Sequence, residues 1–421
     1  MRILLATDFY PPFIGGAERQ VQLLAQNLAR RGHAVSVVTV WHDGLAKREV
    51  ESGVTIHRIK GLATEMRRFY SDPGRRHHPP FADPRLAWRI RRIASRERAE
   101  VVHANGWIAY SCAAALLGKR TPLIVSVRDY GYSCAVRTLL RAGTLCEGPE
   151  LFKCLRCAEG TYGAPKAVVA VAGLFGGRVL LRRKTTAAHS VSRFVQSVVG
   201  RDLLAGMGSG PILRTLADVA PPRVSAIPPP EEGDETYLDQ LPPVPFILFV
   251  GALQPHKGLG PLLSAYRQMK DPPPLVMIGT TWQDTPTEFP ASVTVLRDVP
   301  NRIVMAAWRR SLFGVAPSIW PDPLPGVVRE AMSQGKPVVA SDIGGNPDMV
   351  EHERTGLLVP PGDVPALRSA MERLAQDATL RERLGRAAQV SAGHYTAVEV
   401  VPAFEGLYAE ALAATAGRAT R

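Results

Sequence analysis

Short apolar runs alternate with longer amphipathic stretches along the first part of the chain. The runs at 2–7, 35–40, 99–104 and 122–127 have the length and the β-branched content of buried strands. Between the first two, apolar residues recur every three to four positions from about residue 17 to residue 31, which indicates an amphipathic helix. Strands that alternate with helices in this way predict a doubly wound α/β domain with a parallel sheet.

The same alternation resumes in the second half of the chain after a break. The segment 220–245 is rich in Pro and acidic residues and lacks periodicity, which is typical of a linker. Apolar runs with the length of buried strands then follow at 246–251, 274–279, 293–296, 312–318 and 337–341. We therefore expect two tandem α/β domains, divided into an N-terminal domain at 1–225, a linker at 226–245, a second domain at 246–395 and a final helix at 396–421 that packs back on the first domain.

The composition is that of a soluble protein with sizeable cores. The chain has 421 residues, of which 46% are hydrophobic and 21% are charged. No apolar run approaches the roughly 20 residues that span a bilayer, and the apolar part of MRILLATDFYPP is too short for a signal peptide. We therefore expect a cytoplasmic protein.

The net charge of +13 is unevenly distributed along the chain. Residues 1–230 hold 34 Lys and Arg against 16 Asp and Glu, whereas residues 231–421 hold 17 against 22. A basic half predicts an anionic partner, which leaves nucleic acid, an acidic membrane surface and a phosphorylated lipid as candidates. We expect no nucleic-acid partner, because the basic residues lack the interleaved stacking aromatics of a recognisable module.

Two basic segments each have two interpretations. The segment 85–100 has apolar residues at helical spacing, which predicts a helix. Its many Arg residues either bind the anionic partner or simply form the solvent-exposed face of that helix. The segment 165–184 is apolar with basic ends, and it either lies at a membrane interface or forms a core helix.

Five cysteines in a chain of this length do not indicate a secreted disulfide scaffold. Cys112 lies in YSCAAALL, which predicts a position in the core of a helix. The other four are closely spaced, at Cys134, Cys146, Cys154 and Cys157. The last two form a CxxC, but the other spacings fit no standard zinc finger. A structural zinc site and free thiols that pack a loop are both open interpretations.

Loops that suit an anion follow three of the predicted strands. Gly15 and Gly16 open the first helix, Lys257 in GALQPHKGL lies just before another, and Gly344 and Gly345 follow PVVAS. Glycine allows a ligand to approach the backbone, a helix N-terminus favours negative charge, and an ammonium group binds phosphate. Each loop alone can be a simple turn or a surface lysine. Together, at the carboxyl ends of strands, they make a bound diphosphate plausible.

The stretch WPDPLPGVVREAM places carboxylates on both sides of a loop that becomes a helix. Glu330 lies early in the helix that begins near Gly326, and this position also suits simple compensation of the helix dipole. Asp322 can accept hydrogen bonds from sugar or ribose hydroxyls, and backbone N–H groups of 326–328 suit phosphate. The chain contains no DxD, so we expect no catalytic metal or other required cofactor.

Three ordered motifs resemble one enzyme family over nearly the whole chain. They are YPPFIGGAERQVQLLAQNLARRGHAVSVVT, VGALQPHKGL and PSIWPDPLPGVVREAMSQGKPVVASDIGGNPDMV. The first resembles the N-terminal glycine loop and helix, the second the phosphate-binding loop and the third the E-x7-E region of glycosyltransferase family 4. The resemblance implies the GT-B fold, in which two Rossmann-like domains face each other across a cleft, and a retaining reaction with a nucleotide-sugar donor.

The resemblance also implies a role for individual residues. Donor-binding roles fall on Gly15, Gly16, Lys257, Gly326, Val327, Glu330, Gly344 and Gly345. Lys257 would neutralise the diphosphate, Glu330 would bind the ribose and Asp322 would contact the donor sugar. Asp322, Glu330 and Arg128 are the candidate catalytic residues.

Three positions depart from the family pattern. Asp322 stands where the first Glu of E-x7-E is expected, and Ala252 stands where an Arg often helps to hold phosphate. Arg128 stands where a His often precedes the DY dipeptide, and a guanidinium cannot act as a base although it can hold a phosphate or a carboxylate.

The resemblance predicts transfer of a sugar from a UDP- or GDP-linked donor to a sugar or lipid-linked sugar acceptor. Bacterial surface or exopolysaccharide biosynthesis is the expected setting, with the protein cytoplasmic and peripheral on the inner face of the cytoplasmic membrane. The alternatives are an epimerase-like GT-B enzyme, which would consume donor without an acceptor, and a nucleotide-sugar-binding protein with weakened activity.

Overall fold

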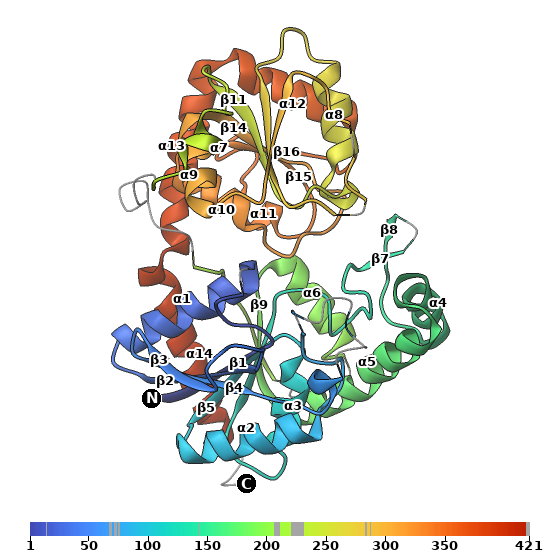
Figure 1. The fold of residues 1–421 in the computed structure, drawn as a ribbon, viewed down its shortest axis with the longest axis vertical. Helices are drawn as coiled ribbons and strands as arrows, with labels where there is room; N and C mark the ends of the chain where they lie inside the picture. Colours follow the sequence, from blue (N-terminus) through green and yellow to red (C-terminus); the bar gives the residue numbers. More distant parts are fainter. Residues whose placement is uncertain are drawn as a thin grey trace. The chain divides into compact units, whose positions relative to one another are not determined.

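The computed structural model describes most of the chain as two compact units (Figure 1). The described residues are 1–13, 15–66, 70, 74, 76–141, 143–205, 211–219, 231–282, 284–286 and 288–417. The first unit comprises Met1–Val219 and Val400–Arg421, and the second comprises Ala220–Glu399. Residues 226–230 of the expected linker lie outside the described residues.

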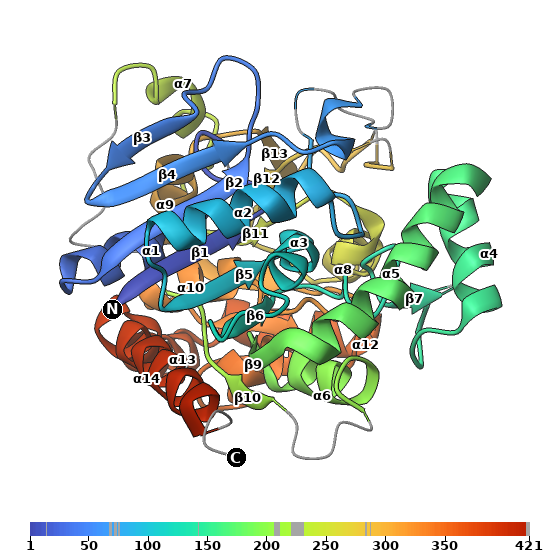
Figure 2. The ribbon, with the colours of Figure 1, turned by 90° about the horizontal axis from the view of Figure 1, so that it is seen from below.

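The first unit is built on an eight-stranded sheet with the order β10-β9-β6-β5-β1-β2-β4-β3 (Figure 2). Its strands are β1 Arg2–Thr7, β2 Ala34–Val40, β3 Arg48–Glu51, β4 Val54–Ile59, β5 Val101–Asn105, β6 Leu123–Val127, β9 Thr185–Ser190 and β10 Ile212–Thr215. All neighbours pair in parallel except β3 and β4, which form an antiparallel edge. Most of these strands are buried along their length, as expected for a parallel sheet covered on both faces.

The helices of the first unit begin where the sequence supplies a start signal. Asp83 precedes α2, and its Oδ1 accepts the backbone N–H groups of Arg85 at 2.9 Å and Leu86 at 3.0 Å, while Pro84 occupies the first helical position. The helices are α1 Gly16–Arg30, α2 Pro84–Arg96, α3 Ile108–Ala115, α4 Leu151–Tyr162, α5 Ala164–Lys184, α6 Arg193–Asp202 and α14 Ala397–Gly417. The small elements are η1 Ala63–Glu65 and a hairpin of β7 Leu140–Arg141 with β8 Thr144–Leu145.

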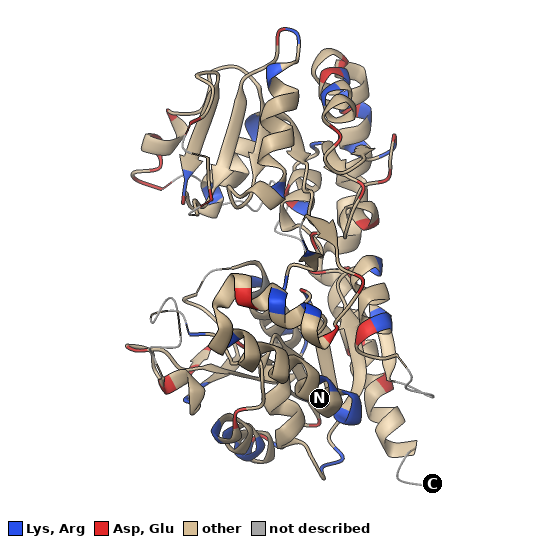
Figure 3. Cartoon of the chain, turned by 90° about the vertical axis from the view of Figure 1, so that its right-hand side faces the viewer, with Lys and Arg blue, Asp and Glu red and all other residues tan. Residues whose placement is uncertain are grey.

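Basic residues are spread over several elements of the described part of this unit. Figure 3 shows Lys and Arg over several helices and loops of the first unit. The segment 85–100 has two interpretations in the sequence, and its residues up to Arg96 lie in α2. The apolar positions Leu86 and Ile90 are buried, whereas Arg92 is exposed.

The C-terminal helix α14 packs on the sheet of the first unit. Buried His103 of β5 has its Nδ1 2.9 Å from the hydroxyl of Tyr408, and its Nε2 is 2.6 Å from the hydroxyl of Ser126. At the surface, Arg31 donates to both carboxylate oxygens of Glu405, at 2.7 and 2.8 Å. These contacts join α14 to β5 and to the end of α1.

We expect Glu405→Gln to destabilise the first unit at about pH 7, because residue 405 then loses its ion pair with Arg31. The hydrogen bond from Arg31 lowers the pKa of Glu405 from 4.5 to about 2. A depressed pKa in the folded state stabilises the fold above the unfolded pKa, and this contribution is lost as the pH falls from 4.5 towards 2. Urea unfolding should therefore separate wild type from variant near neutrality, and the difference should shrink in that acid range. A constant difference at every pH would contradict the assignment.

The second unit is a six-stranded sheet in which all neighbouring strands are parallel, with the order β13-β12-β11-β14-β15-β16. Its strands are β11 Phe246–Val250, β12 Leu275–Gly279, β13 Val293–Arg297, β14 Ser311–Ala316, β15 Val338–Ser341 and β16 Leu357–Val359. Its helices are α7 Glu235–Leu238, η4 Pro255–Lys257, α8 Leu259–Arg267, α9 Asn301–Arg310, α10 Gly326–Ser333, α11 Asn346–Met349, α12 Val364–Gln376, α13 Ala378–Ser391 and η5 Ala392–Tyr395.

One hydrophobic core joins the strands of this second sheet to α8, α12 and α13. Phe249, Phe313 and Val339 contribute from the strands, and Leu263 and Met371 contribute from the helices. The two units thus confirm the prediction of two doubly wound parallel sheets.

Candidate functional site

The order in which strands are added to the second sheet reverses at its middle, between β11 and β14. From β11 the chain proceeds to β12 and β13 on one side, and it then returns to β14, β15 and β16 on the other. In open parallel sheets, ligands bind at such a switch point, beyond the carboxyl ends of the strands. The loops after β11 and β14, which carry Lys257 and Asp322, therefore meet where a ligand is expected.

Lys257 and Asp322 form an ion pair across this switch point. The Nζ of Lys257 lies 2.5 Å from Oδ2 of Asp322, with the two side chains 20% and 13% exposed. The same Nζ lies 4.6 Å from the centre of the Trp320 ring. The ammonium group is thus held between a carboxylate and an aromatic face while part of it remains accessible.

The backbone brings the two loops together. Gly258 ends η4 with a φ of +82°, and a Cβ placed there would lie 1.9 Å from the carbonyl oxygen of Pro317. The backbone N–H groups of Ile319 and Trp320 donate to the carbonyl of His256, at 3.1 and 3.3 Å. Burial, followed by the charge of Lys257, lowers the pKa of His256, so its ring is neutral near pH 7.

Glu330 and the start of α10 lie on the same loop–helix segment as Asp322. Glu330 is half-buried in the second turn of the helix, and its Oε1 accepts from Nδ2 of Asn301 at 3.3 Å. Gly326 is exposed at the first position, and Pro325 before it provides no side-chain cap. The helix N-terminus therefore presents backbone N–H groups that suit an anion.

Arg329 adds positive charge beneath this segment. Its side chain is buried, and burial lowers its pKa to about 10 against the opposing effects of Tyr395, Glu330 and Asp322. A pKa of about 10 leaves the guanidinium charged near neutrality.

Gly344 and Gly345, at the carboxyl end of β15, pack against the loop that carries Asp322. Gly344 has a φ of +64°, and a Cβ there would lie 2.3 Å from the carbonyl oxygen of Asp322. A Cβ on Gly345 would lie 2.2 Å from the carbonyl oxygen of Pro323, and the Gly345 N–H donates to Asp322 O at 2.8 Å. The glycine pair thus fixes the position of the Asp322 loop.

The first unit holds the remaining candidates, Gly15, Gly16 and Arg128. Gly16 begins α1 with nothing within 4 Å of an added Cβ, and Gly15 before it is extended and lacks a side-chain cap. Arg128 follows β6, where its Nε donates to Oδ1 of Asn105 at 3.1 Å and its Nη1 pairs with Asp218. The structure thus divides the candidate residues between the two units.

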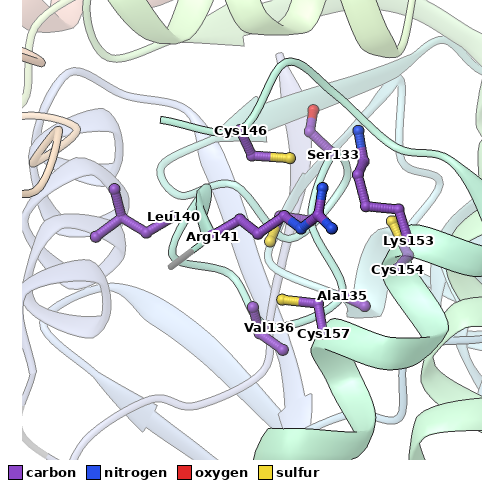
Figure 4. A pocket seen from close by; sticks show the side chains of 10 residues that line it. Ser133, Ala135, Val136, Leu140, Arg141, Cys146, Lys153, Cys154 and Cys157 are labelled. Carbon is purple, nitrogen blue, oxygen red and sulfur yellow. The ribbon is translucent and has the colours of Figure 1, made fainter. Parts of the chain in front are cut away.

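The four closely spaced cysteines line one cavity of about 20 Å³, together with Arg141 and Lys153 (Figure 4). Burial, and then the neighbouring Cys134 and Cys146, raise the pKa of Cys154 and Cys157, which keeps these thiols protonated near neutrality. Within the described ranges, no three His, Cys, Asp or Glu side chains are arranged to hold a metal ion. The structural zinc site stays a prediction, whereas Cys112 is buried in α3 as expected.

Trp320 and Asn301 contact the candidate residues but are not among the sequence predictions. Trp320 lies two residues before Asp322, and an aromatic ring beside a candidate sugar-binding carboxylate is a usable signal. Asn301 begins α9 after β13, and its contact with Glu330 depends on the packing of α9 beside α10, which has no local signature.

Two family models match successive parts of the chain. The model described as Glycosyltransferase Family 4 matches residues 14–171, and the model described as Glycosyl transferases group 1 matches residues 240–391. Each range includes all the candidate residues of its own unit.

Among curated proteins, the first relatives match over local stretches that cover 12% to 39% of their own length. One is the Exopolysaccharide phosphotransferase SCO2592 of Streptomyces coelicolor, 34% identical over 26% of this chain and 12% of that protein. The uncharacterized glycosyltransferase MJ1607 of Methanocaldococcus jannaschii is 24% identical over 91% of each chain.

Solved structures share the fold at low sequence identity. Sucrose-phosphate synthase from Thermosynechococcus elongatus aligns with a TM-score of 0.71 and 18% identity, over 98% of this chain and 99% of the other. Anabaena Alr3699/HepE, solved with UDP-glucose, aligns with a TM-score of 0.65 and 17% identity over the same shares. The two family matches on a chain with this two-unit fold show that the protein belongs to glycosyltransferase family 4, with the GT-B fold.

Proposed function

We propose that the protein is a retaining hexosyltransferase that uses a UDP- or GDP-linked sugar. The observation that carries this proposal is the Lys257–Asp322 pair at the switch point of the second sheet, on the segment that continues to α10 and Glu330. A cation, two carboxylates and an uncapped helix N-terminus together match the groups of a nucleotide-sugar, which are a diphosphate and two sets of hydroxyls. The structural neighbour that was solved with UDP-glucose supports the donor class.

Each group has a distinct part in the proposed transfer. The bond between the anomeric carbon and the diphosphate oxygen breaks, and the acceptor hydroxyl oxygen forms its new bond on the same face of the sugar. The acceptor proton passes to the leaving phosphate. The ammonium of Lys257 and the N–H groups at Gly326 and Val327 stabilise the charge that develops on the diphosphate. Glu330 holds the ribose and Asp322 the sugar, as the family resemblance implies.

Asp322 also positions Lys257 before the donor binds. The ion pair keeps the ammonium group at the switch point, so the charge needs little reorganisation when the diphosphate arrives. The ammonium of Lys257 and the N–H groups at the start of α10 supply positive charge from the protein itself, and we therefore propose that transfer needs no divalent cation.

The acceptor side belongs to the first unit in this proposal. Gly15 and Gly16 leave the backbone at the start of α1 open to a ligand, and Arg128, held by Asn105 and Asp218, contacts a phosphate or carboxylate of the acceptor. The basic excess of residues 1–230 supports an anionic acceptor, namely a lipid-linked sugar at the inner face of the cytoplasmic membrane. The exopolysaccharide relative supports polysaccharide assembly as the setting.

The test is nucleotide release from a panel of UDP-, GDP-, ADP- and dTDP-hexoses in the presence of EDTA. We expect slow release from one UDP- or GDP-sugar at a rate that EDTA leaves unchanged. NMR of the released sugar before mutarotation should show the anomeric configuration of the donor. An inverted sugar would contradict the retaining mechanism, and release that requires added Mg²⁺ would contradict metal independence.

A further inference from the structure

The helix α5 has an apolar face that no part of the described chain covers. Its large exposed side chains include Val168, Val169 and Val179, which are 57%, 48% and 50% exposed. Of its most apolar 18-residue window, 39% is buried. A helix that is apolar on all sides normally lies in a protein core or in a membrane, so this exposure needs an explanation.

The opposite face of α5 packs against other elements of the first unit. Ala167, Ala170, Val171 and Leu174 pack in a core cluster with Cys154 and Ala158 of α4. A Cβ on Gly173 would lie 2.2 Å from the carbonyl oxygen of Pro80, and a Cβ on Gly177 would lie 2.4 Å from the ring of Tyr110. By length and composition α5 could cross a membrane, a test that core helices also pass. These contacts instead hold it along the surface of its own unit.

The exposed positions form one stripe. Pro165, Val168, Ala172, Gly176, Val179 and Arg183 are all exposed and recur every three to four residues. At 100° per residue they lie within one narrow sector of the helix, with the buried residues on the other side. In a helix that faces only water, this sector would carry polar side chains.

The charges around the stripe are almost all positive. The hairpin of α4 and α5, residues 151–184, contains seven Lys and Arg and one acidic residue, Glu159. Lys166 and Arg183 are exposed near the two ends of α5, and Arg156 is exposed on α4. At the start of α4, Phe152 is 73% exposed. In Figures 1 and 2 the hairpin lies at the margin of the first unit.

We propose that this stripe of α5 is the surface by which the protein docks on an anionic lipid bilayer. The valines enter the boundary between headgroups and acyl chains, with the helix axis parallel to the membrane plane. Lys166, Arg183 and their basic neighbours contact anionic headgroups. Charge complementarity favours a bilayer over a second copy of the chain, since two such basic hairpins would repel each other. The biological purpose, access to a lipid-linked acceptor, rests on the proposed function.

The test is flotation of the full chain with vesicles of equal parts phosphatidylglycerol and phosphatidylcholine. Wild type should float with these vesicles and much less with phosphatidylcholine alone, and high salt should weaken its binding. V168D/V179D should bind at least about tenfold more weakly, because two carboxylates then face the headgroups. The matched control is V390D, since Val390 is 78% exposed on α13 of the second unit, and it should bind like wild type.

A melting temperature and a rate of nucleotide release equal to those of wild type would show that V168D/V179D is folded. Failure of wild type to float with the anionic vesicles, or equal flotation of V168D/V179D, would overturn the proposal. So would a dimer that V168D/V179D dissociates, measured by light scattering, because a second copy would then cover the stripe. If wild type floated with the anionic vesicles but turned over no donor, the proposed function would be overturned, whereas the proposed docking surface would be supported.

Discussion

Lys257→Ala should reduce turnover of the nucleotide-sugar by about a hundred- to a thousandfold while the protein remains folded. The substitution removes the ammonium group that stabilises the leaving diphosphate, and loss of one preorganised group of this kind raises the barrier by about 3–4 kcal/mol. It also removes the partner of the Asp322 carboxylate at the switch point. The measurement is steady-state nucleotide release with the preferred donor.

Lys270→Ala is the matched control for this variant. Lys270 is an exposed lysine of the same unit, beyond the end of α8, and it should be replaceable without effect on turnover. The melting temperatures of both variants show whether a loss of turnover is accompanied by a loss of the folded structure. If Lys257→Ala turned over the donor at the rate of wild type, Lys257 would not belong to the donor site.

Gly345→Ala should weaken donor binding at least about tenfold and destabilise the second unit by about 1–3 kcal/mol. The added methyl group would lie 2.2 Å from the carbonyl oxygen of Pro323, so the loop before α10 must move. That loop carries Asp322, and the ion pair of Asp322 with Lys257 fixes the position of the ammonium group. Calorimetric titration with the preferred nucleotide and urea unfolding measure the two effects.

Gly260→Ala serves as the control for the added methyl group. Gly260 lies in α8 with nothing within 4 Å of an added Cβ, and alanine in a helix is favoured over glycine by about 1 kcal/mol. This variant should bind nucleotide like wild type and be at least as stable. If Gly345→Ala retained the affinity of wild type, the glycine pair would have no part in holding the Asp322 loop.

Much of the fold can be predicted from the sequence because buried parallel strands are short and apolar. RILLAT is β1 over the full predicted range, and FILFVG differs from β11 by one residue. The strand β9 cannot be predicted in this way, because four of the six residues of TTAAHS are polar. Its polar side chains are buried, and His189 is held by tertiary contacts such as the 2.7 Å contact between its Nδ1 and the Ser126 hydroxyl.

The interpretation of α5 also depends on tertiary packing. Its composition suits both a core helix and a membrane interface. In the structure one face of the helix packs closely inward at Gly173 and Gly177, as a core helix does, while the other face is exposed at Val168 and Val179. The membrane interface stays a proposal. Residue periodicity cannot separate the two faces when both are apolar.

The candidate site can be predicted in part. The residue types of Lys257, Asp322 and Glu330 suggest donor chemistry, but the 2.5 Å contact between the first two joins loops 65 residues apart in sequence. That contact depends on the pairing of β11 beside β14, which neither loop encodes alone. Positions 344 and 345 are glycine because a Cβ at either would clash with the backbone of the Asp322 loop. That close approach comes from the tertiary structure, and no local pattern indicates it.

The most direct test of the central claim compares nucleotide release from the donor panel by wild type, Glu330→Ala and Glu382→Ala. Glu382 is an exposed glutamate on α13 and controls for the loss of a carboxylate from the same unit. The account predicts that wild type and Glu382→Ala release nucleotide from the same single donor at the same rate, while Glu330→Ala releases almost none. Equal release by Glu330→Ala, or release from no donor even when lipid-linked sugar acceptors are supplied, would contradict it.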